Sequence, residues 1–161
     1  MSNKKKLVSF GNIATLARGR VPGQVVIQYT DKCNAACSQC GMRISNKFER
    51  TKLEMDDVKR LIDAMAERGV EAISFTGGEP MLFVDEIAEL IKYATAAGIR
   101  YTRTGTNGYI FRGSDKEGYE AKITRIAELL ADSEIYTLWI SVDSAVPEIH
   151  ENNRGLPGMV K

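Results

Sequence analysis

Segments typical of β-strands and of α-helices alternate along this chain of 161 residues. The strand-like segments are short and rich in β-branched and aromatic residues, whereas the helix-like segments have apolar residues at intervals of three and four. The predicted strands are 24–30, 72–76, 99–104 and 136–142, and the predicted helices are 54–68, 84–97 and 123–131. Because parallel neighbouring strands need long crossover connections, the alternation indicates an α/β fold of about four parallel βα units.

Two segments outside these predicted strands and helices are expected to be irregular. Residues 105–119 are rich in glycine and charge, and we expect either a substrate loop or a solvated insertion there. The segment after the last strand is expected to be a loop, because it holds Pro147, Gly155, Pro157 and Gly158.

The size and charge of the chain limit what it binds and where it works. A length of 161 residues with 43% hydrophobic residues suits one domain with one core. Lys and Arg number 22 against 21 Asp and Glu, so the net charge of +1 indicates a small partner rather than nucleic acid. The sequence has no apolar run of signal-peptide or membrane-span length. We therefore expect a cytoplasmic protein with reduced cysteines.

Three cysteines, Cys33, Cys37 and Cys40, follow the first predicted strand with the spacing CxxxCxxC. An odd number of cysteines so close together does not suit a disulfide framework. Thiolates bind iron–sulfur clusters, and a cluster of four irons normally takes four of them. Three on one loop would leave the fourth iron open for chemistry. The alternatives are a structural zinc site, which would have to recruit the distant His150, and three unligated buried thiols.

This cysteine motif resembles the cluster motif of the radical S-adenosylmethionine superfamily. That family has a Gly-Gly-Glu-Pro element at the end of the second strand, and Gly77, Gly78, Glu79 and Pro80 match it. Glycines let the backbone approach a ligand closely, and carbonyl and carboxylate oxygens accept hydrogen bonds from an ammonium group. The resemblance implies that this element binds the amino group of S-adenosylmethionine. The alternative is a tight turn that starts a helix.

Polar residues at the ends of the third and fourth strands extend the resemblance. Thr106 and Asn107 follow the third strand, and Ser141 and Asp143 lie at the end of the fourth. In similar proteins the polar residues at these strand ends line the cofactor site. Ser141 and Asp143 are two positions apart, so we expect both side chains to face the same interior. For Thr106 and Asn107, a plain turn with left-handed backbone is the alternative.

The resemblance assigns two more residues to the cofactor site. Gln39 precedes the last cysteine, where the family commonly has an aromatic residue that lies along the adenine. Arg154 belongs to a segment that resembles the family's His-Asp-x-x-Arg-Gly pattern, and its planar fork of donors suits a carboxylate of the cofactor or the substrate. The alternative for Arg154 is a surface ion pair with Glu148 or Glu151.

The fold implied by the resemblance is a partial (β/α)6-type barrel. The resemblance covers about residues 24–161, which leaves 1–23 as an N-terminal extension. The family's barrel usually has six βα units and this chain has about four, so we expect a piece truncated at its C-terminus. Its open edges would be the strands 24–30 and 136–142, and we expect the isolated chain to associate with other chains at these edges.

The activity implied by the resemblance is that of a radical enzyme. A reduced four-iron four-sulfur cluster would cleave S-adenosylmethionine to methionine and a 5′-deoxyadenosyl radical, which abstracts hydrogen from an unidentified small-molecule or peptide substrate. An electron donor such as flavodoxin or ferredoxin would be the partner. The alternatives are an iron–sulfur protein for electron transfer or sensing, and an inactive fragment of the enzyme. Fold analogy does not choose the substrate.

Overall fold

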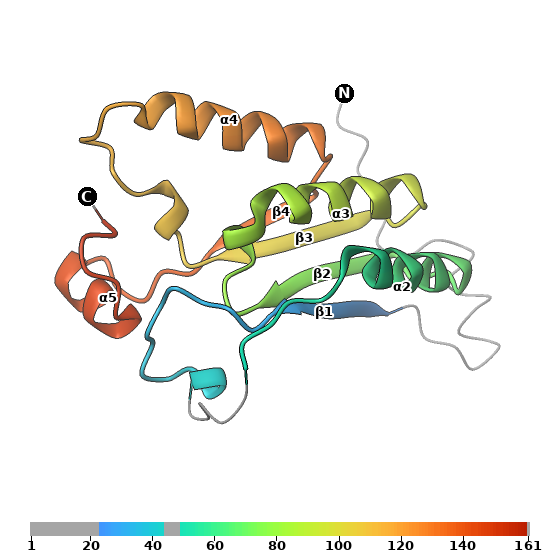
Figure 1. Ribbon diagram of the computed structural model, residues 1–161, viewed down its shortest axis with the longest axis horizontal. Helices are drawn as coiled ribbons and strands as arrows, with labels where there is room; N and C mark the ends of the chain where they lie inside the picture. The colour runs from blue at the N-terminus through green and yellow to red at the C-terminus, as the bar shows by residue number, and fades with distance from the viewer. Residues whose placement is uncertain (1–22, 44–48, 161) are drawn as a thin grey trace.

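A single parallel sheet forms the centre of the computed structural model, which describes residues 23–43 and 49–160 (Figure 1). The predicted extension at 1–23 lies, apart from its last residue, outside these ranges. The strands are β1 (Gln24–Thr30), β2 (Ala72–Gly77), β3 (Tyr101–Thr106) and β4 (Thr137–Ile140), and the helices are α2 (Met55–Glu67), α3 (Val84–Ala96), α4 (Tyr119–Asp132) and α5 (Pro147–Arg154), with short 3-10 turns at Gly41–Arg43, Pro80–Phe83 and Tyr109–Phe111.

The strands pair in parallel in the order β1-β2-β3-β4. The predicted α/β fold is therefore confirmed. Within the described sheet, β1 and β4 are the edge strands, as expected, and both expose apolar side chains: Val26 is 58% exposed and Ile140 is 52% exposed. The association expected at these edges stays a prediction.

Helices α2, α3 and α4 lie along one face of the sheet (Figure 1). Ile27, Tyr29, Ile73 and Phe75 point from β1 and β2 into this helical layer and are almost fully buried. Burial of an Ile or Phe side chain contributes about 1.5–3 kcal/mol each. The other face carries the alternate residues of each strand, such as the exposed Val26, and no helix of the described ranges covers it.

Most predicted elements are confirmed with shifted boundaries. β3 begins two residues after the predicted start, because Ile99 lies in the turn that closes α3: its N–H donates to the Ala94 carbonyl at 3.0 Å, and its side chain is buried. α4 begins at Tyr119, four residues before the predicted start. The residues of its first turn are mostly exposed and therefore show no apolar period.

The prediction of a loop after β4 was wrong, because residues 147–154 form α5. Pro147 suits the first turn, where its missing N–H has no helical partner. Gly155 ends the helix with φ of 58°. Only His150 of this helix is buried, so the sequence has no apolar stripe there that would have indicated a helix.

The connection between β3 and α4 is solvated only in part. Ile110 and Phe111 pack against a small apolar cluster that includes Met81 and Ile126, whereas residues 114–118 are exposed. The expected solvated insertion is thus confirmed for its second half alone. In the described ranges, no helix is long and apolar enough to cross a membrane.

Candidate functional site

The carboxyl ends of the strands face a cavity of about 250 Å³ beside the loop that follows β1. We call residues 31–40 the cysteine loop; it and α5 lie at the same end of the sheet (Figure 1). All the residues predicted to form the site, except Asp143, line this cavity: Cys33, Cys37, Gln39, Cys40, Gly77, Gly78, Glu79, Thr106, Asn107, Ser141 and Arg154. Residues from four separate strand ends are therefore brought together as predicted.

The three cysteines are free thiols on one side of the cavity. Desolvation raises the pKa of the Cys33 thiol, the N–H of Ala35, which donates to its sulfur at 3.4 Å, opposes the rise, and the charges of Glu79 and the other two cysteines add to it. Among the described residues, no three His, Cys, Asp or Glu side chains converge on a single metal ion. A cluster of several irons takes each thiolate on a different iron.

The two glycines at the end of β2 allow a close approach to the start of the cysteine loop. A side chain at Gly77 would overlap the Thr30 carbonyl, and a side chain at Gly78 would overlap the Lys32 carbonyl. The N–H groups of Gly78 and Glu79 donate to these two carbonyls at 2.7 and 2.9 Å. The glycine pair thus joins β2 to the backbone just before Cys33.

Both carboxylate oxygens of Glu79 accept backbone hydrogen bonds. Oε2 accepts from the N–H of Asn107 at 2.7 Å, and Oε1 accepts from the N–H of Met81 at 3.0 Å. The side chain is only 3% exposed, and burial raises its pKa, although these hydrogen bonds and the charge of Arg154 oppose the rise. Glu79 therefore caps the 3-10 turn at Pro80–Phe83, as the alternative interpretation expected, and also ties the end of β2 to the end of β3.

Asn107 connects β3 to the cysteine loop. Its Nδ2 donates to Oδ1 of Asn34 at 2.8 Å, and its Oδ1 accepts from the N–H of Tyr109. The hydroxyl of Thr106 accepts from the N–H of Gly108, whose φ is 88°. The turn of the alternative interpretation is therefore present, but only Gly108 and not Asn107 has left-handed backbone. Thr106 and Asn107 of this turn line the same cavity.

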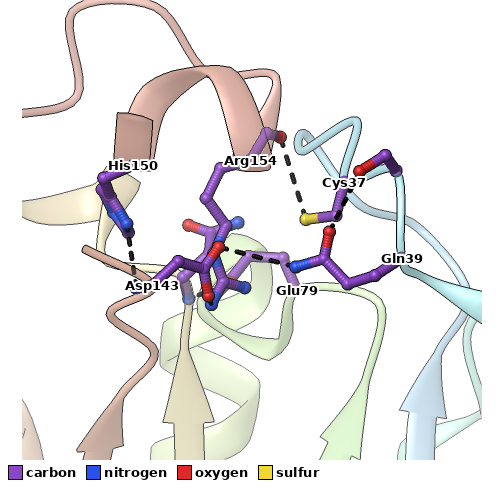
Figure 2. Close-up of polar contacts among 8 residues, drawn as sticks. Cys37, Gln39, Glu79, Asp143, His150 and Arg154 are labelled. Atoms are coloured by element: carbon purple, nitrogen blue, oxygen red, sulfur yellow. Dashed lines mark hydrogen bonds and ion pairs between the residues drawn. The ribbon is translucent and has the colours of Figure 1, made fainter. Parts of the chain in front are cut away.

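The segment after β4 forms a polar network beside the cysteine loop (Figure 2). Nη2 of Arg154 donates to Oδ1 of Asp143 at 2.6 Å, so the alternative interpretation, a surface ion pair with Glu148 or Glu151, was wrong in its partner. The other oxygen of Asp143 lies 3.5 Å from Nε2 of Gln39. His150, the candidate zinc ligand, accepts a hydrogen bond from the N–H of Asp143.

Sequence reasoning missed Trp139 as a residue of the cavity wall. Its indole rests on Gly105, where any side chain would overlap the ring, and both residues line the cavity. Gly105 does not have a positive φ, so the space for the indole explains a glycine inside a strand. Trp139 lies two positions before Ser141, and this alternation was the signal that could have identified it.

The family assignment comes from a comparison of the whole sequence. The model of the Radical SAM superfamily matches residues 27–158. The chain therefore belongs to the radical SAM superfamily, whose cofactors are a four-iron four-sulfur cluster and S-adenosylmethionine.

Curated relatives of this chain include enzymes with different substrates. It is 32% identical to the AdoMet-dependent heme synthase of Oleidesulfovibrio alaskensis over 131 residues, which are 81% of this chain and 30% of that protein. It is 30% identical to the GTP 3',8-cyclase of Vibrio parahaemolyticus over 132 residues, which are 80% of this chain and 36% of that protein. The chain thus spans about a third of the length of these relatives.

Solved structures share the fold at lower sequence identity. SuiB of Streptococcus suis, bound to S-adenosylmethionine, has a TM-score of 0.63 and 22% identity, over 90% of this chain and 31% of SuiB. BtrN, in complex with AdoMet and 2-DOIA, has a TM-score of 0.55 and 17% identity, over 83% of this chain and 63% of BtrN. These likenesses support the partial radical SAM barrel.

The residues around the cavity fit the family's cofactors. Three free thiols of one loop face a space bounded on other sides by Gly78, Ser141 and Arg154. The Nε of Arg154 is buried and has no acceptor in the described part of the chain. A carboxylate bound in the cavity would supply that acceptor.

Proposed function

We propose that this chain is the cofactor-binding part of a radical SAM enzyme, with Cys33, Cys37 and Cys40 as the ligands of a four-iron four-sulfur cluster. When bound, the cluster and S-adenosylmethionine supply a 5′-deoxyadenosyl radical, formed together with methionine, that takes a hydrogen atom from the substrate. The observation that carries the proposal is the cavity of about 250 Å³ that the three cysteines share with the Gly-Gly-Glu element and with the ends of β3 and β4.

The chain's own residues bind and orient the cofactor in this proposal. The carbonyl groups of Gly77 and Gly78 are the acceptors for the N–H groups of the methionyl amino group. Glu79, whose two oxygens accept backbone N–H groups, holds the ends of β2 and β3 in place. Arg154 and Ser141 are the donors for the carboxylate and the ribose, and Gln39 lies along the adenine.

The remaining wall of the cavity would exclude water from the reacting atoms. Trp139 and Thr76 lie on the sheet side of the cavity. A large indole that is fixed against Gly105 gives an apolar surface at this point, and we assign it to the boundary between cofactor and substrate. Asp143 orients Arg154 in this account and does not itself contact the ligand.

The cellular setting is part of the proposal. We place the protein in the cytoplasm, with a flavodoxin or ferredoxin as electron donor and an unidentified small molecule or peptide as substrate. The near-neutral charge of the sequence supports a small ligand over nucleic acid.

Product analysis tests the proposed function. The anaerobically reconstituted chain is incubated with S-adenosylmethionine and dithionite, and 5′-deoxyadenosine and methionine are measured by liquid chromatography. We expect both products in equal amounts, and none from a variant in which the three cysteines are replaced by Ala. A chain that holds the cluster, is reduced by dithionite and yields neither product would favour electron transfer or sensing instead.

A further inference from the structure

The last turn of α5 contacts the middle of the cysteine loop. The N–H of Ala36 donates a hydrogen bond to the carbonyl oxygen of Arg154 at 2.7 Å. The thiol of Cys37 lies 3.8 Å from the same oxygen (Figure 2). The thiol contact needs a proton that the sulfur loses when it binds iron, whereas the Ala36 N–H bond does not depend on protonation. The Ala36 bond is therefore a link between the two segments that persists when the sulfur binds iron.

Gly155 brings the same turn into direct contact with the loop. A Cβ atom at this position would lie 2.6 Å from Cβ of Ala36 and 3.1 Å from its carbonyl oxygen. Gly155 also has a φ of 58°, as expected for a glycine that ends a helix. Two independent features of the site thus require glycine: the end of α5 and the close approach to the loop.

The side chain of Arg154 fixes this turn to the sheet. Its ion pair with Asp143 is largely buried, with the two side chains 15% and 19% exposed. Asp143 lies three residues after the end of β4, and its N–H donates to Nδ1 of His150 in α5. The end of α5 is thereby tied to the end of β4, and the loop is tied to the end of α5.

We propose that the Arg154–Gly155 turn is a positioning element for the cluster, because it fixes Ala36 between the two ligands Cys33 and Cys37. The other side of the loop is already joined to β2 through Lys32 and Glu79. With both sides held, the loop presents its thiols in one arrangement before iron is bound, which reduces the entropy lost on binding. This inference rests on the proposed function, since it presupposes the cluster.

A pair of glycine substitutions tests the proposal. Gly155→Ala adds a side chain against Ala36, whereas Gly158→Ala has a similar positive φ of 72° and meets nothing within 4 Å. The strain of left-handed backbone is thus similar in the two variants, and only the collision differs. The rate of iron release from the reconstituted full chain to a ferrous chelator is measured under anaerobic conditions. We expect Gly155→Ala to release iron about five- to tenfold faster, the ratio for the loss of one buried hydrogen bond.

A rescue variant separates positioning from general stability. Adding Ala36→Gly to Gly155→Ala removes the closest of these contacts, the one at 2.6 Å, so iron release should fall back toward the rate of Ala36→Gly alone. If Gly155→Ala does not fold, recovery of folding and iron binding in the double variant supports the same contact. Equal rates of iron release from Gly155→Ala and Gly158→Ala would overturn the proposal. So would a double variant that releases iron as fast as Gly155→Ala. An unmodified chain that binds no iron would instead refute the proposed function itself.

Discussion

Replacement of Glu79 by Ala should destabilise the fold through the hydrogen bonds that its carboxylate accepts. The side chain is buried, and so are Met81 and Asn107, whose N–H groups donate to its two oxygens. Glu79→Ala removes both acceptors from sites that water reaches poorly. The ends of β2 and β3 then lose the side chain that joins them.

The size of this effect follows from the two donors. A buried N–H group without an acceptor costs about 1–3 kcal/mol, so two cost about 2–6 kcal/mol. The raised pKa of Glu79 means that burial disfavours its charged form, and removal of the charge offsets part of this cost. We expect a net loss of about 2–4 kcal/mol in the free energy of unfolding. Glu79→Gln keeps one acceptor and should lose about half as much.

Urea unfolding of the iron-free chain, followed by circular dichroism, measures these losses. Glu128→Ala is the matched control, because Glu128 is exposed on α4 and should change little. Amide exchange adds a local measurement, since the N–H groups of Met81 and Asn107 should exchange much faster in Glu79→Ala. If Glu79→Ala is as stable as Glu128→Ala and both amides stay protected, the role assigned to Glu79 is refuted.

Three further predictions concern the cysteine loop, the pH dependence of stability and the cavity wall. Gly78→Val should lower the retention of iron several-fold, because the new side chain overlaps the backbone of the cysteine loop. Gly41→Ala places its side chain where no atom lies within 4 Å and should retain iron normally, and the iron content of both variants is measured after gel filtration. Burial raises the pKa of Glu86, but hydrogen bonds from Lys52 and a buried tyrosine outweigh this effect, so the pKa is lowered on folding. The unmodified chain should therefore lose stability as the pH falls through that pKa, and Glu86→Gln should lose less, as urea midpoints measured against pH would show. Trp139, the sole tryptophan, should change its fluorescence when S-adenosylmethionine is added to the reconstituted chain, and unchanged emission would contradict its place in the wall.

Local sequence patterns were sufficient for most of the fold and for most of the residues that line the cavity. β1 reproduces its predicted bounds, because its apolar residues are followed directly by the polar cysteine loop. The cavity residues were predictable because parallel strands place their carboxyl ends at one edge of the sheet. Cys33, Gly78, Asn107 and Ser141 therefore meet in space although they are far apart in the sequence.

Contacts between distant segments were not predictable in the same way. α5 has no apolar stripe, and its position depends on Gly155 meeting Ala36, which no local period encodes. The partner of Arg154 is Asp143 and not a nearby glutamate, because the end of α5 faces the end of β4. The acceptor role of Glu79 depends on the N–H of Asn107, which belongs to another strand.

Electron paramagnetic resonance of the reduced, reconstituted chain tests the central claim most directly. We expect about four irons per chain, as the family's cluster requires, and loss of the cluster when any of Cys33, Cys37 or Cys40 is replaced by Ala. Addition of S-adenosylmethionine should change the spectrum, because its amino and carboxylate groups reach the iron that has no cysteine. Stoichiometric zinc in place of iron, or a spectrum identical with and without S-adenosylmethionine, would contradict the account.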